Sequence, residues 1–499
     1  MIISDSSFAI NPNFLADQLD QLLPEVKRAV RERISIRDFE QFVQQLVAQI
    51  GASVISLYLE MQGTGDLGET ITTEEGETFY RSDEPRQRTI RTIFGVHQFR
   101  QYVYGRNLDR KTDFYPVDVA IQMPEGKYSL WFREIIHHLC VNDSYQQVSD
   151  LIQLIFGQQI PVDSLERITN NLSKPAEQFL NQIPIPAPEE EGKILVVSAD
   201  GKGVPMVRQT KPFPAFEKRS YPGNRRMATL ATVYSVDEYV RAPEEIIASL
   251  FRENMEHPQK RPHPVGKVVA GFLSQCDEES VLIKGTHRAT VWAAEQVERR
   301  HQTNQPLVRL MDGQISLWDA SDVNFDSYET IDILDIIHVA SYVWDAAKVF
   351  GSHREYQEAF ARDRLLRILK GDVKGVISGM RQMAKKQQMK GERLKKINQV
   401  CNYLERNSQR MRYDTYLQQG LPIATGVIEG ACRHLVMDRM CRTGMRWTTK
   451  GAQAMLHARA IHQACKTTDF HTYLANQEYQ RTAQYRKLLN LPHLPPLPG

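Results

Sequence analysis

The stretch KILVVSADG (residues 193–201) marks a change in the chain from a helical pattern to a strand pattern. Its apolar residues run without interruption over the length of a strand and end at Asp200. A continuous apolar run of this length is typical of a strand that is buried on both faces of a sheet. The segment before it, IPIPAPEEEG (residues 183–192), is proline-rich and then acidic, which indicates a domain boundary. An α/β domain is therefore predicted to begin here.

Strand and helix patterns alternate after this point. RMATLATVYSVDEYVR (residues 226–241) predicts two further strands around a turn at Asp237, and residues 279–302 predict a long helix. Two strands follow, PLVRLM (residues 306–311) and TIDIL (residues 330–334), with a short helix between them. The order β-β-β-α-β-α-β predicts a mixed α/β sheet with helices on its faces, as in ribonuclease H-like folds.

The chain ahead of this domain is mainly helical. Apolar residues at three- and four-residue spacing over about the first 60 residues predict two or three amphipathic helices. RTIRTIFGVHQFRQYVYGR (residues 88–106) alternates instead and is rich in aromatic and β-branched residues, so it predicts a hairpin with its turn at Gly95.

A pair of helices is expected after the hairpin. A turn containing Pro161 joins two helical stretches, and Asp163 with Glu166 three residues later has the spacing of a capping box at the start of the second stretch. Such a pair resembles a helix-turn-helix, whose second helix can enter a major groove of DNA. Two short helices that simply pack a core are the alternative interpretation.

Strand patterns are absent from about Trp344 to Gly420, which predicts an all-helical insertion in the α/β domain. Its residues 362–412 contain fifteen Lys or Arg and four acidic residues. This excess is either a solvated helix surface or the footprint of a polyanion site. The predicted regions are a helical region (1–75), a hairpin region (76–125), a helix-turn-helix-like DNA-binding region (126–182), the ribonuclease H-like α/β domain in two parts (190–345 and 421–470), the basic insertion (346–420) and a C-terminal tail (471–499).

Composition excludes several classes of protein. The chain has 499 residues, 41% hydrophobic and 24% charged, with a net charge of +2, as expected of a soluble protein with about two to four domains. No run of about 18 apolar residues and no signal-peptide pattern occurs, so we expect a cytoplasmic protein without a membrane partner. The six cysteines form no Cys-x-x-Cys pair, and no Walker loop, Gly-x-Ser-x-Gly elbow or His-Glu-x-x-His motif is present.

Three aspartates follow predicted strands: Asp200, Asp312 and Asp335. Side chains at the carboxyl ends of strands in an open α/β sheet reach a common crevice, although single aspartates there are often turn formers or helix caps. Carboxylates are the ligands that Mg²⁺ prefers, and two such ions can activate the attacking and stabilise the leaving oxygen of a phosphodiester. Two strand-end aspartates and one glutamate from a helix would suffice for such a pair of ions.

The segment TGVIEGACRHLVMDRMCRTGMRW (residues 425–447) supplies such a glutamate. Thr425 and Gly426 are plausible caps, which places Glu429 on or near the first turn of a helix. Arginines follow at near-helical spacing, and their mutual repulsion would be relieved by a nucleic-acid backbone. The alternative is a capping glutamate followed by a solvated basic helix. The predicted DNA contacts are Arg433, Arg439, Arg442, Arg446, Lys385, Lys386, Lys395 and Lys396.

Four blocks together resemble the DDE transposases of the Kra-type bacterial insertion sequences, within the Mutator-like group. They are VVSADGKGVPM, RLMDGQISLW, DILDIIHVASYVWDAAKVFG and PIATGVIEGACRHLVMDRMCRTGMRWTTKGAQAMLHARA, and the resemblance covers about residues 192–460. It implies that Asp200, Asp312 and Glu429 are the catalytic, metal-binding carboxylates. It further implies that Asp335 and His338 form an accessory Asp-x-x-His element.

The resemblance implies an activity as well as a site. The protein is expected to bind the terminal inverted repeats of its own element as a homodimer or higher homo-oligomer, associated with the nucleoid. With two Mg²⁺ ions, which Mn²⁺ could replace, it would cut the ends and join them to target DNA. A DNA-binding derivative without catalysis and a metal-dependent nuclease without strand transfer remain alternatives. Relatives commonly carry cysteine pairs ahead of the hairpin, and this chain has none there, so a zinc-bound N-terminal DNA reader is not expected.

Overall fold

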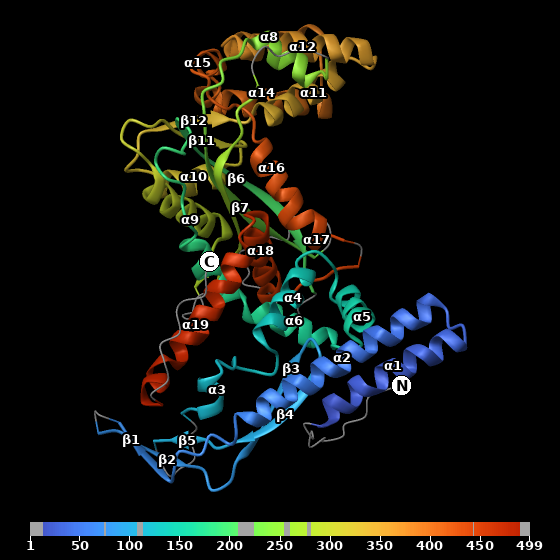
Figure 1. Cartoon of the computed structure of the whole chain (residues 1–499). Helices are drawn as coiled ribbons and strands as arrows, with labels where there is room; N and C mark the ends of the chain where they lie inside the picture. Colours follow the sequence, from blue (N-terminus) through green and yellow to red (C-terminus); the bar gives the residue numbers. More distant parts are fainter. Residues whose placement is uncertain are drawn as a thin grey trace. The chain divides into compact units, whose positions relative to one another are not determined.

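The computed structural model describes residues 13–73, 76–106, 113–207, 224–253, 260–276, 281–442 and 444–489 (Figure 1). The chain divides into two compact units. Unit 1 comprises Met1–Thr169 and Thr467–Gly499, and unit 2 comprises Asn170–Lys466.

Unit 1 combines helices with small antiparallel sheets. The hairpin is formed by β3 (Arg86–Thr92) and β4 (Gly95–Gln101), paired from Arg86↔Gln101 to Thr92↔Gly95, and Gly95 has a φ of 133° at the turn. The other elements are α1 (Asn13–Arg31), α2 (Ile36–Met61), β1 (Thr70–Thr72), β2 (Thr78–Arg81), β5 (Tyr104–Gly105), α3 (Pro116–Ala120), α4 (Leu130–Cys140), α5 (Tyr145–Phe156), α6 (Val162–Asn171) and α19 (Thr467–Leu488).

Two features of unit 1 differ from the sequence-based expectations. The capping box lies at the start of α5, where Ser144 and Gln147 satisfy each other's backbone N–H groups, and not at Asp163 and Glu166 in α6. Residues 467–488 form helix α19, although a tail was expected from residue 471; the proline-rich residues 490–499 lie outside the described residues. α19 packs against α3 and α4, and its Tyr485 stacks on Phe114, so tertiary contacts stabilise a helix that periodicity did not predict.

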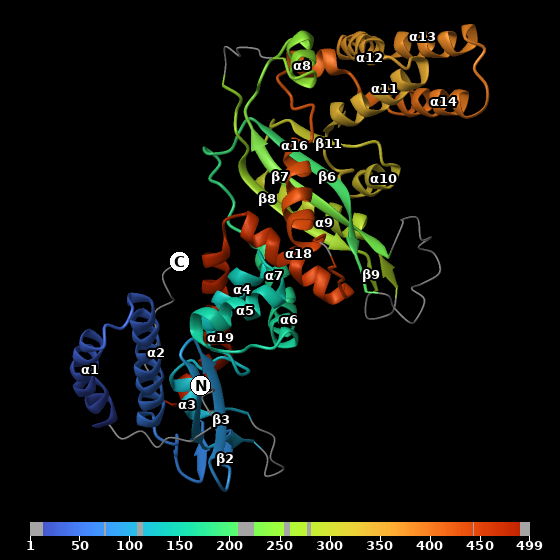
Figure 2. The same cartoon turned by 90° about the vertical axis from the view of Figure 1, so that its right-hand side faces the viewer.

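Unit 2 is built on a five-stranded mixed sheet with the order β12-β11-β6-β7-β8 (Figure 2). β6, β7 and β8 form an antiparallel meander, whereas β11 and β12 run parallel to β6. The strands are β6 (Ile194–Pro205), β7 (Arg225–Val236), β8 (Val265–Leu273), β11 (Leu307–Met311) and β12 (Thr330–Leu334), and a separate pair is formed by β9 (Gln275–Cys276) and β10 (Leu282–Ile283). The chain thus contains the predicted mixed α/β sheet.

The meander was predicted incorrectly in detail. Residues 226–241 hold one long strand, β7, and not two strands around Asp237; the third strand is β8, after helix α8 (Pro243–Leu250). β6 also does not end at Asp200 but continues to Pro205, because residues 201–205 keep pairing with β7. Pairing with β7 therefore keeps the backbone extended through Gly201 and Gly203, although glycines at this spacing are typical of a turn.

Helices cover the sheet and form a second layer of core. α9 (Gly285–Arg300) packs on β7 and β8, α18 (Thr449–Gln463) packs on β8, and α7 (Ser173–Asn181) contacts α18. α10 (Ile315–Asn324) packs on α9. The remaining helices are α11 (Ile336–Phe350), α12 (Arg354–Leu369), α13 (Val373–Lys386), α14 (Gly391–Arg406), α15 (Tyr413–Gln418), α16 (Gly426–Ala431) and α17 (Asp438–Met440).

Helices α11 to α14 form a bundle within unit 2 (Figure 2). Its apolar side chains join those of the sheet in one cluster, which includes Ile333 of β12, Val343 of α11 and Val400 of α14. Residues 346–420 are thus helical and share a core with the strands, all of which precede them in sequence.

Candidate active site

Three aspartates lie in one row across the parallel strands of unit 2. Leu307 of β11 pairs with Leu195 of β6 and with Thr330 of β12. The same register, continued to the end of β11, places Asp312 beside Asp200 on one side and Asp335 on the other. Residues at equal register in parallel strands face the same side of a sheet. The sheet therefore brings together three carboxylates that are distant in sequence: Asp200 and Asp312 are 112 residues apart, and Asp312 and Asp335 are 23 residues apart.

Asp312 follows β11 directly and is held by its own loop. Its Oδ1 accepts a hydrogen bond from the Gln314 N–H at 2.9 Å, and its carbonyl oxygen accepts one from Trp318 Nε1 at 2.6 Å. Its Oδ2 lies 3.9 Å from His338 Nδ1. Burial raises the pKa of the Asp312 carboxyl, and the Asp200 and Asp335 carboxylates raise it further.

Asp335 is fully buried and ties two segments together. It caps α11, where its Oδ1 accepts from the Ile337 N–H at 3.1 Å. The Thr425 N–H donates to the same oxygen at 3.2 Å, and the Thr425 hydroxyl donates to Oδ2 at 2.8 Å. Thr425 therefore does not cap α16 with its side chain; it joins the start of α16 to the end of β12. Burial raises the pKa of the Asp335 carboxyl despite these hydrogen bonds.

Glu429 lies on the first turn of α16, as the sequence predicted, and its carboxylate lies beside Asp335 and His338. One ligand atom from each of Asp335, His338 and Glu429 lies within 4.8 Å of the others. His338 Nε2 is 4.0 Å from Asp335 Oδ2. Burial and the neighbouring Asp335 carboxylate raise the pKa of Glu429. The raised pKa values mean that burial, joined by neighbouring carboxylates at Asp312 and Glu429, disfavours the ionised forms, and a bound cation would relieve this.

Asp200 belongs to the row of three aspartates but not to the group formed by Asp335, His338 and Glu429. Its Oδ1 accepts from the Gly201 N–H at 2.6 Å, and its Oδ2 accepts from the Cys432 thiol at 3.3 Å. Its charge raises the pKa of both Asp312 and Glu429. The structure thus brings Asp200, Asp312 and Glu429 into one electrostatic environment and places Asp335 and His338 inside it. Sequence reasoning missed Thr425 and Cys432 as partners, because no local pattern links them to aspartates so distant in sequence.

The basic residues after Glu429 do not share one helical face. The helix passes through a π-helical turn (Cys432–Met437) and ends with α17 at Met440, so Arg442 and Arg446 lie beyond it. Both side chains are exposed, as is Arg433. Arg439 is 1% exposed and lies over the Trp447 ring at 5.1 Å, so it is part of the core and does not lie on a surface that DNA could reach. The expected set of phosphate contacts is thereby reduced by one.

The insertion presents its lysines at two places. Lys385 and Lys386 are exposed in the last turn of α13. In α14, Lys395 lies 3.4 Å from a Glu392 oxygen, and Lys396 lies 2.9 Å from an Asp345 oxygen. The first two are therefore the stronger candidates for phosphate contacts, since the other two already have carboxylate partners.

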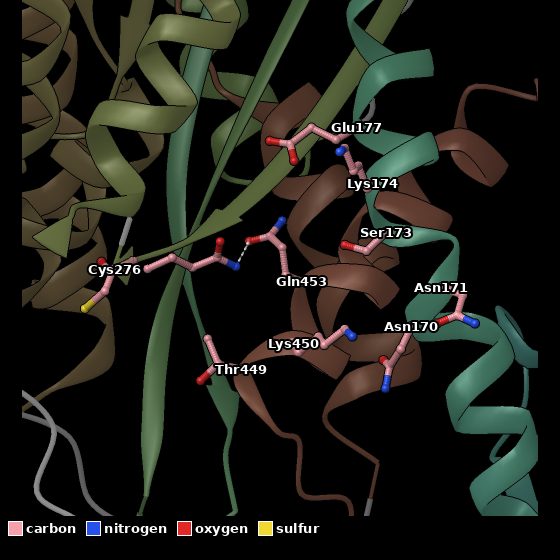
Figure 3. Close-up of a pocket in the computed structure, with 11 residues that line it drawn as sticks. Asn170, Asn171, Ser173, Lys174, Glu177, Cys276, Thr449, Lys450 and Gln453 are labelled. Atoms are coloured by element: carbon pink, nitrogen blue, oxygen red, sulfur yellow. Dashed lines mark hydrogen bonds between the residues drawn. The ribbon is translucent and has the colours of Figure 1, made fainter. Parts of the chain in front are cut away.

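A polar pocket of about 680 Å³ lies at the carboxyl end of β8 (Figure 3). Lys174 from α7 and Lys450 from α18 line it, and Gln453 contributes to its wall with Nε2 bonded to the Gly271 carbonyl. β6, β8 and β11 run in the same direction. The pocket and the acidic cluster therefore both lie toward the carboxyl ends of these strands. The sequence carried no signal for this pocket, because its residues come from separate helices and a strand. The lining residues are Asn170, Asn171, Ser173, Lys174, Glu177, Ser274, Gln275, Cys276, Thr449, Lys450 and Gln453.

Comparisons with known proteins add little to this geometry. No protein-family model matches the chain, and no curated protein matches it. Among solved structures, the chain is similar to the Drosophila P element transposase strand transfer complex, with a TM-score of 0.23 and 10% sequence identity over 75% of this chain and 88% of that one. A likeness this slight carries no argument about the present chain, whose resemblance to Kra-type transposases stays a prediction.

Proposed function

We propose that the protein is a DNA transposase of the Kra type, which cuts the ends of its element and joins them to target DNA. The observation that carries this proposal is the row of three aspartates, with Glu429 and His338 beside it, at one edge of the sheet. Five metal-ligating side chains from four segments converge there. The raised pKa values of Asp312, Asp335 and Glu429 are those expected of carboxylates that bind a cation.

We further infer that the sheet of unit 2 is ribonuclease H-like. An antiparallel three-stranded meander followed by two parallel strands, with α9 between β8 and β11, is the arrangement that this inference requires. It also fits the position of the acidic groups, since Asp200 within β6 lies level with the carboxyl ends of β11 and β12.

The carboxylates would hold two Mg²⁺ ions, with Mn²⁺ as a substitute. Hard oxygen donors fit these cations, and His338 adds a nitrogen that Mn²⁺ accepts. Bound there, the ions would activate water or a 3′-hydroxyl and stabilise the leaving oxygen. Asp200, Asp312 and Glu429 are the proposed catalytic ligands. Asp335 is proposed to fix the start of α16 through Thr425, which positions Glu429, and to share a metal with His338.

DNA is the proposed partner, both as element ends and as target, and the protein would act in the cytoplasm on the nucleoid as a homo-oligomer. Phosphate contacts position DNA without reading its sequence. Arg433, Arg442 and Arg446 lie exposed after Glu429, and the pocket lysines lie at the same sheet edge. A helix-turn-helix-like role for α5 and α6 would supply contacts that are specific for the ends.

The direct test is cleavage and strand transfer on labelled DNA that carries the element's ends, with Mg²⁺ or EDTA. Mg²⁺-dependent nicking at the ends followed by joined products would support the transposase. Nicking without joined products would indicate the nuclease alternative. Tight binding to the ends without nicking in Mg²⁺ or Mn²⁺ would indicate the DNA-binding derivative.

Metal binding should be visible as a change in thermal stability. We expect Mg²⁺ at about ten times its Kd to stabilise the wild-type protein by about 1.4 kcal/mol, which is roughly 3–6 °C for a unit of this size. Differential scanning fluorimetry with and without EDTA measures this. Mg²⁺ should leave Glu429→Gln unshifted, and a wild-type-sized shift in that variant would contradict the assignment.

The same variant should be more stable than wild type in EDTA. The pKa of Glu429 is raised from 4.5, so its ionisation destabilises the folded state. The two proteins should therefore melt alike below pH 4.5 and diverge as pH rises through the raised pKa, with Glu429→Gln the more stable at pH 7. A lower melting temperature for Glu429→Gln across this range would contradict a raised pKa of Glu429 in the folded protein.

The pocket lysines should contribute to DNA affinity through phosphates. Lys174→Ala/Lys450→Ala is expected to weaken binding uniformly across DNA sequences and to reduce the slope of log K against log salt by about 1.8, since each lost phosphate contact reduces it by about 0.9. Lys193→Ala/Lys267→Ala is the matched control, because these exposed lysines lie at the opposite end of β6 and β8. Fluorescence anisotropy across a salt series measures the slope, and equal slopes for both variants would exclude the pocket from DNA binding.

A further inference from the structure

Exposed apolar side chains are concentrated on the first two helices of unit 1. Ile36 and Met61, at the two ends of α2, are 81% and 77% exposed, and Val47 near its middle is 56% exposed. A concentration of this kind marks an interaction site. The exposed large apolar side chains of α1, α2 and the turn between them are Leu23, Val30, Ile34, Ile36, Val43, Val47, Val54, Tyr58 and Met61.

Another side of α2 is already occupied by its own unit. The helix packs against β4, and Leu59 on that side is 3% exposed. The Ser56 hydroxyl lies 2.9 Å from His97 Nδ1 of β4, and Gln44 Nε2 donates to the Ile155 carbonyl at 2.6 Å. Both views show α2 alongside the β3–β4 hairpin (Figures 1 and 2). These contacts fix the rotation of α2, so its exposed stripe is not a misplaced part of the core.

The stripe has a seven-residue repeat. Ile36, Val43, Ile50 and Leu57 are seven residues apart, and a second series, also seven apart, is interleaved with them at steps of four and three. This is the a/d spacing of a coiled coil, sustained through nearly four heptads of a helix about 39 Å long. The second series is Val47, Val54 and Met61. In this register Val47 and Val54 occupy a positions, and Ile36, Val43, Ile50 and Leu57 occupy d positions.

We propose that α2 forms a two-stranded coiled coil with α2 of a second copy of this chain. A stripe that repeats every seven residues is complementary to itself, as a two-fold interface requires. From Gln41 to Leu59 the helix carries no charged side chain, so two copies can pair along this stretch without bringing like charges together; Glu40 lies at the a position that precedes Val47. Buried valines, isoleucines and leucines would supply the free energy of association.

A membrane is the competing occupant. α2 is the one helix among the described residues that is long and apolar enough to cross a bilayer by length and composition, and 11% of its most apolar window is buried. Spanning a bilayer would remove Ser56 and Gln44 from their partners on the unit and leave polar groups in hydrocarbon, which is costly. A coiled coil keeps these contacts and covers the exposed stripe alone.

Sedimentation equilibrium of the full-length protein, without DNA or metal, tests the proposal. We expect a wild-type dimer at about 10 µM, and at least about 100-fold weaker association for Val47→Glu/Val54→Glu. These side chains are 56% and 47% exposed in one copy, so the variant should fold normally, with an unchanged circular dichroism spectrum. Gln45→Glu/Gln49→Glu is the matched control: both residues are exposed on α2 outside the stripe, and this variant should remain dimeric.

Three results would overturn the coiled coil. They are a wild-type monomer at about 100 µM, a dimer that survives Val47→Glu/Val54→Glu, and sedimentation of the wild type with phosphatidylcholine–phosphatidylglycerol vesicles that the valine variant abolishes. The inference is independent of catalysis, because Glu429→Gln should dimerise like the wild type. Loss of cleavage and loss of the dimer can therefore be told apart.

Discussion

Glu429→Gln is expected to lose at least about 10³-fold in the rate of Mg²⁺-dependent strand cleavage, equivalent to about 4 kcal/mol of transition-state stabilisation. The substitution keeps the shape of the side chain and removes the charge that would hold a metal next to Asp335 and His338. DNA affinity should change by less than about threefold, because phosphate contacts come from basic residues elsewhere. Single-turnover cleavage of end-labelled DNA and anisotropy binding measure the two effects separately.

A control on the same helix separates charge from folding. Val427→Ala shortens an apolar side chain on α16 that packs against the core of unit 2, and it should reduce stability while leaving cleavage by the folded fraction within about threefold. Glu429→Asp should recover part of the activity, since a carboxylate remains but is displaced by one methylene group. Cleavage by Glu429→Gln at the wild-type rate would show that Glu429 is not a metal ligand but an ordinary acidic residue in the first turn of a helix.

Asp335→Ala is expected to have the largest effect on stability. Asp335 is 0% exposed and accepts three hydrogen bonds, two from Thr425 and one from Ile337. Alanine would leave these donors unsatisfied in the core, at a cost of about 2–4 kcal/mol, or roughly 5–10 °C in melting temperature. The loss of a carboxylate that is costly to bury offsets part of this, since its pKa is raised. Chemical denaturation followed by tryptophan fluorescence measures the change.

Asp335→Asn separates the structural role from the metal role. The amide oxygen can accept the Ile337 and Thr425 N–H groups, and the Thr425 hydroxyl can reverse to accept from the new NH₂ group. Its stability should therefore stay within about 1 kcal/mol of wild type, yet Mg²⁺ should no longer raise its melting temperature fully. Thr425→Val, which removes one donor and no charge, should keep the Mg²⁺ shift. If Asp335→Asn binds Mg²⁺ and cleaves like the wild type, Asp335 has a positioning role alone.

The order of strands and helices in unit 2 followed from apolar periodicity because each element there buries a continuous or periodic apolar surface. The strands β11 and β12 were predicted within one residue, since an aspartate ends each apolar run. The meander was predicted poorly for the opposite reason. The glycines of β6 suggested a turn, and the residues after β7 suggested a further strand. Pairing with a neighbouring strand, which a local pattern does not contain, decides where these strands end.

The sequence by itself determined which residue types stand at the ends of β11 and β12 and on the first turn of α16. The end of an apolar run can be located from the sequence alone, without knowing which segments pack beside it. Only the tertiary structure decided how they meet. The register of three parallel strands aligns Asp200, Asp312 and Asp335 in one row, and Thr425 ties α16 to Asp335 across 90 residues. The same holds for Arg439, which the sequence pattern placed on a DNA-facing helix but which is buried over the Trp447 ring. Register and packing depend on contacts between distant segments, which a linear pattern does not contain.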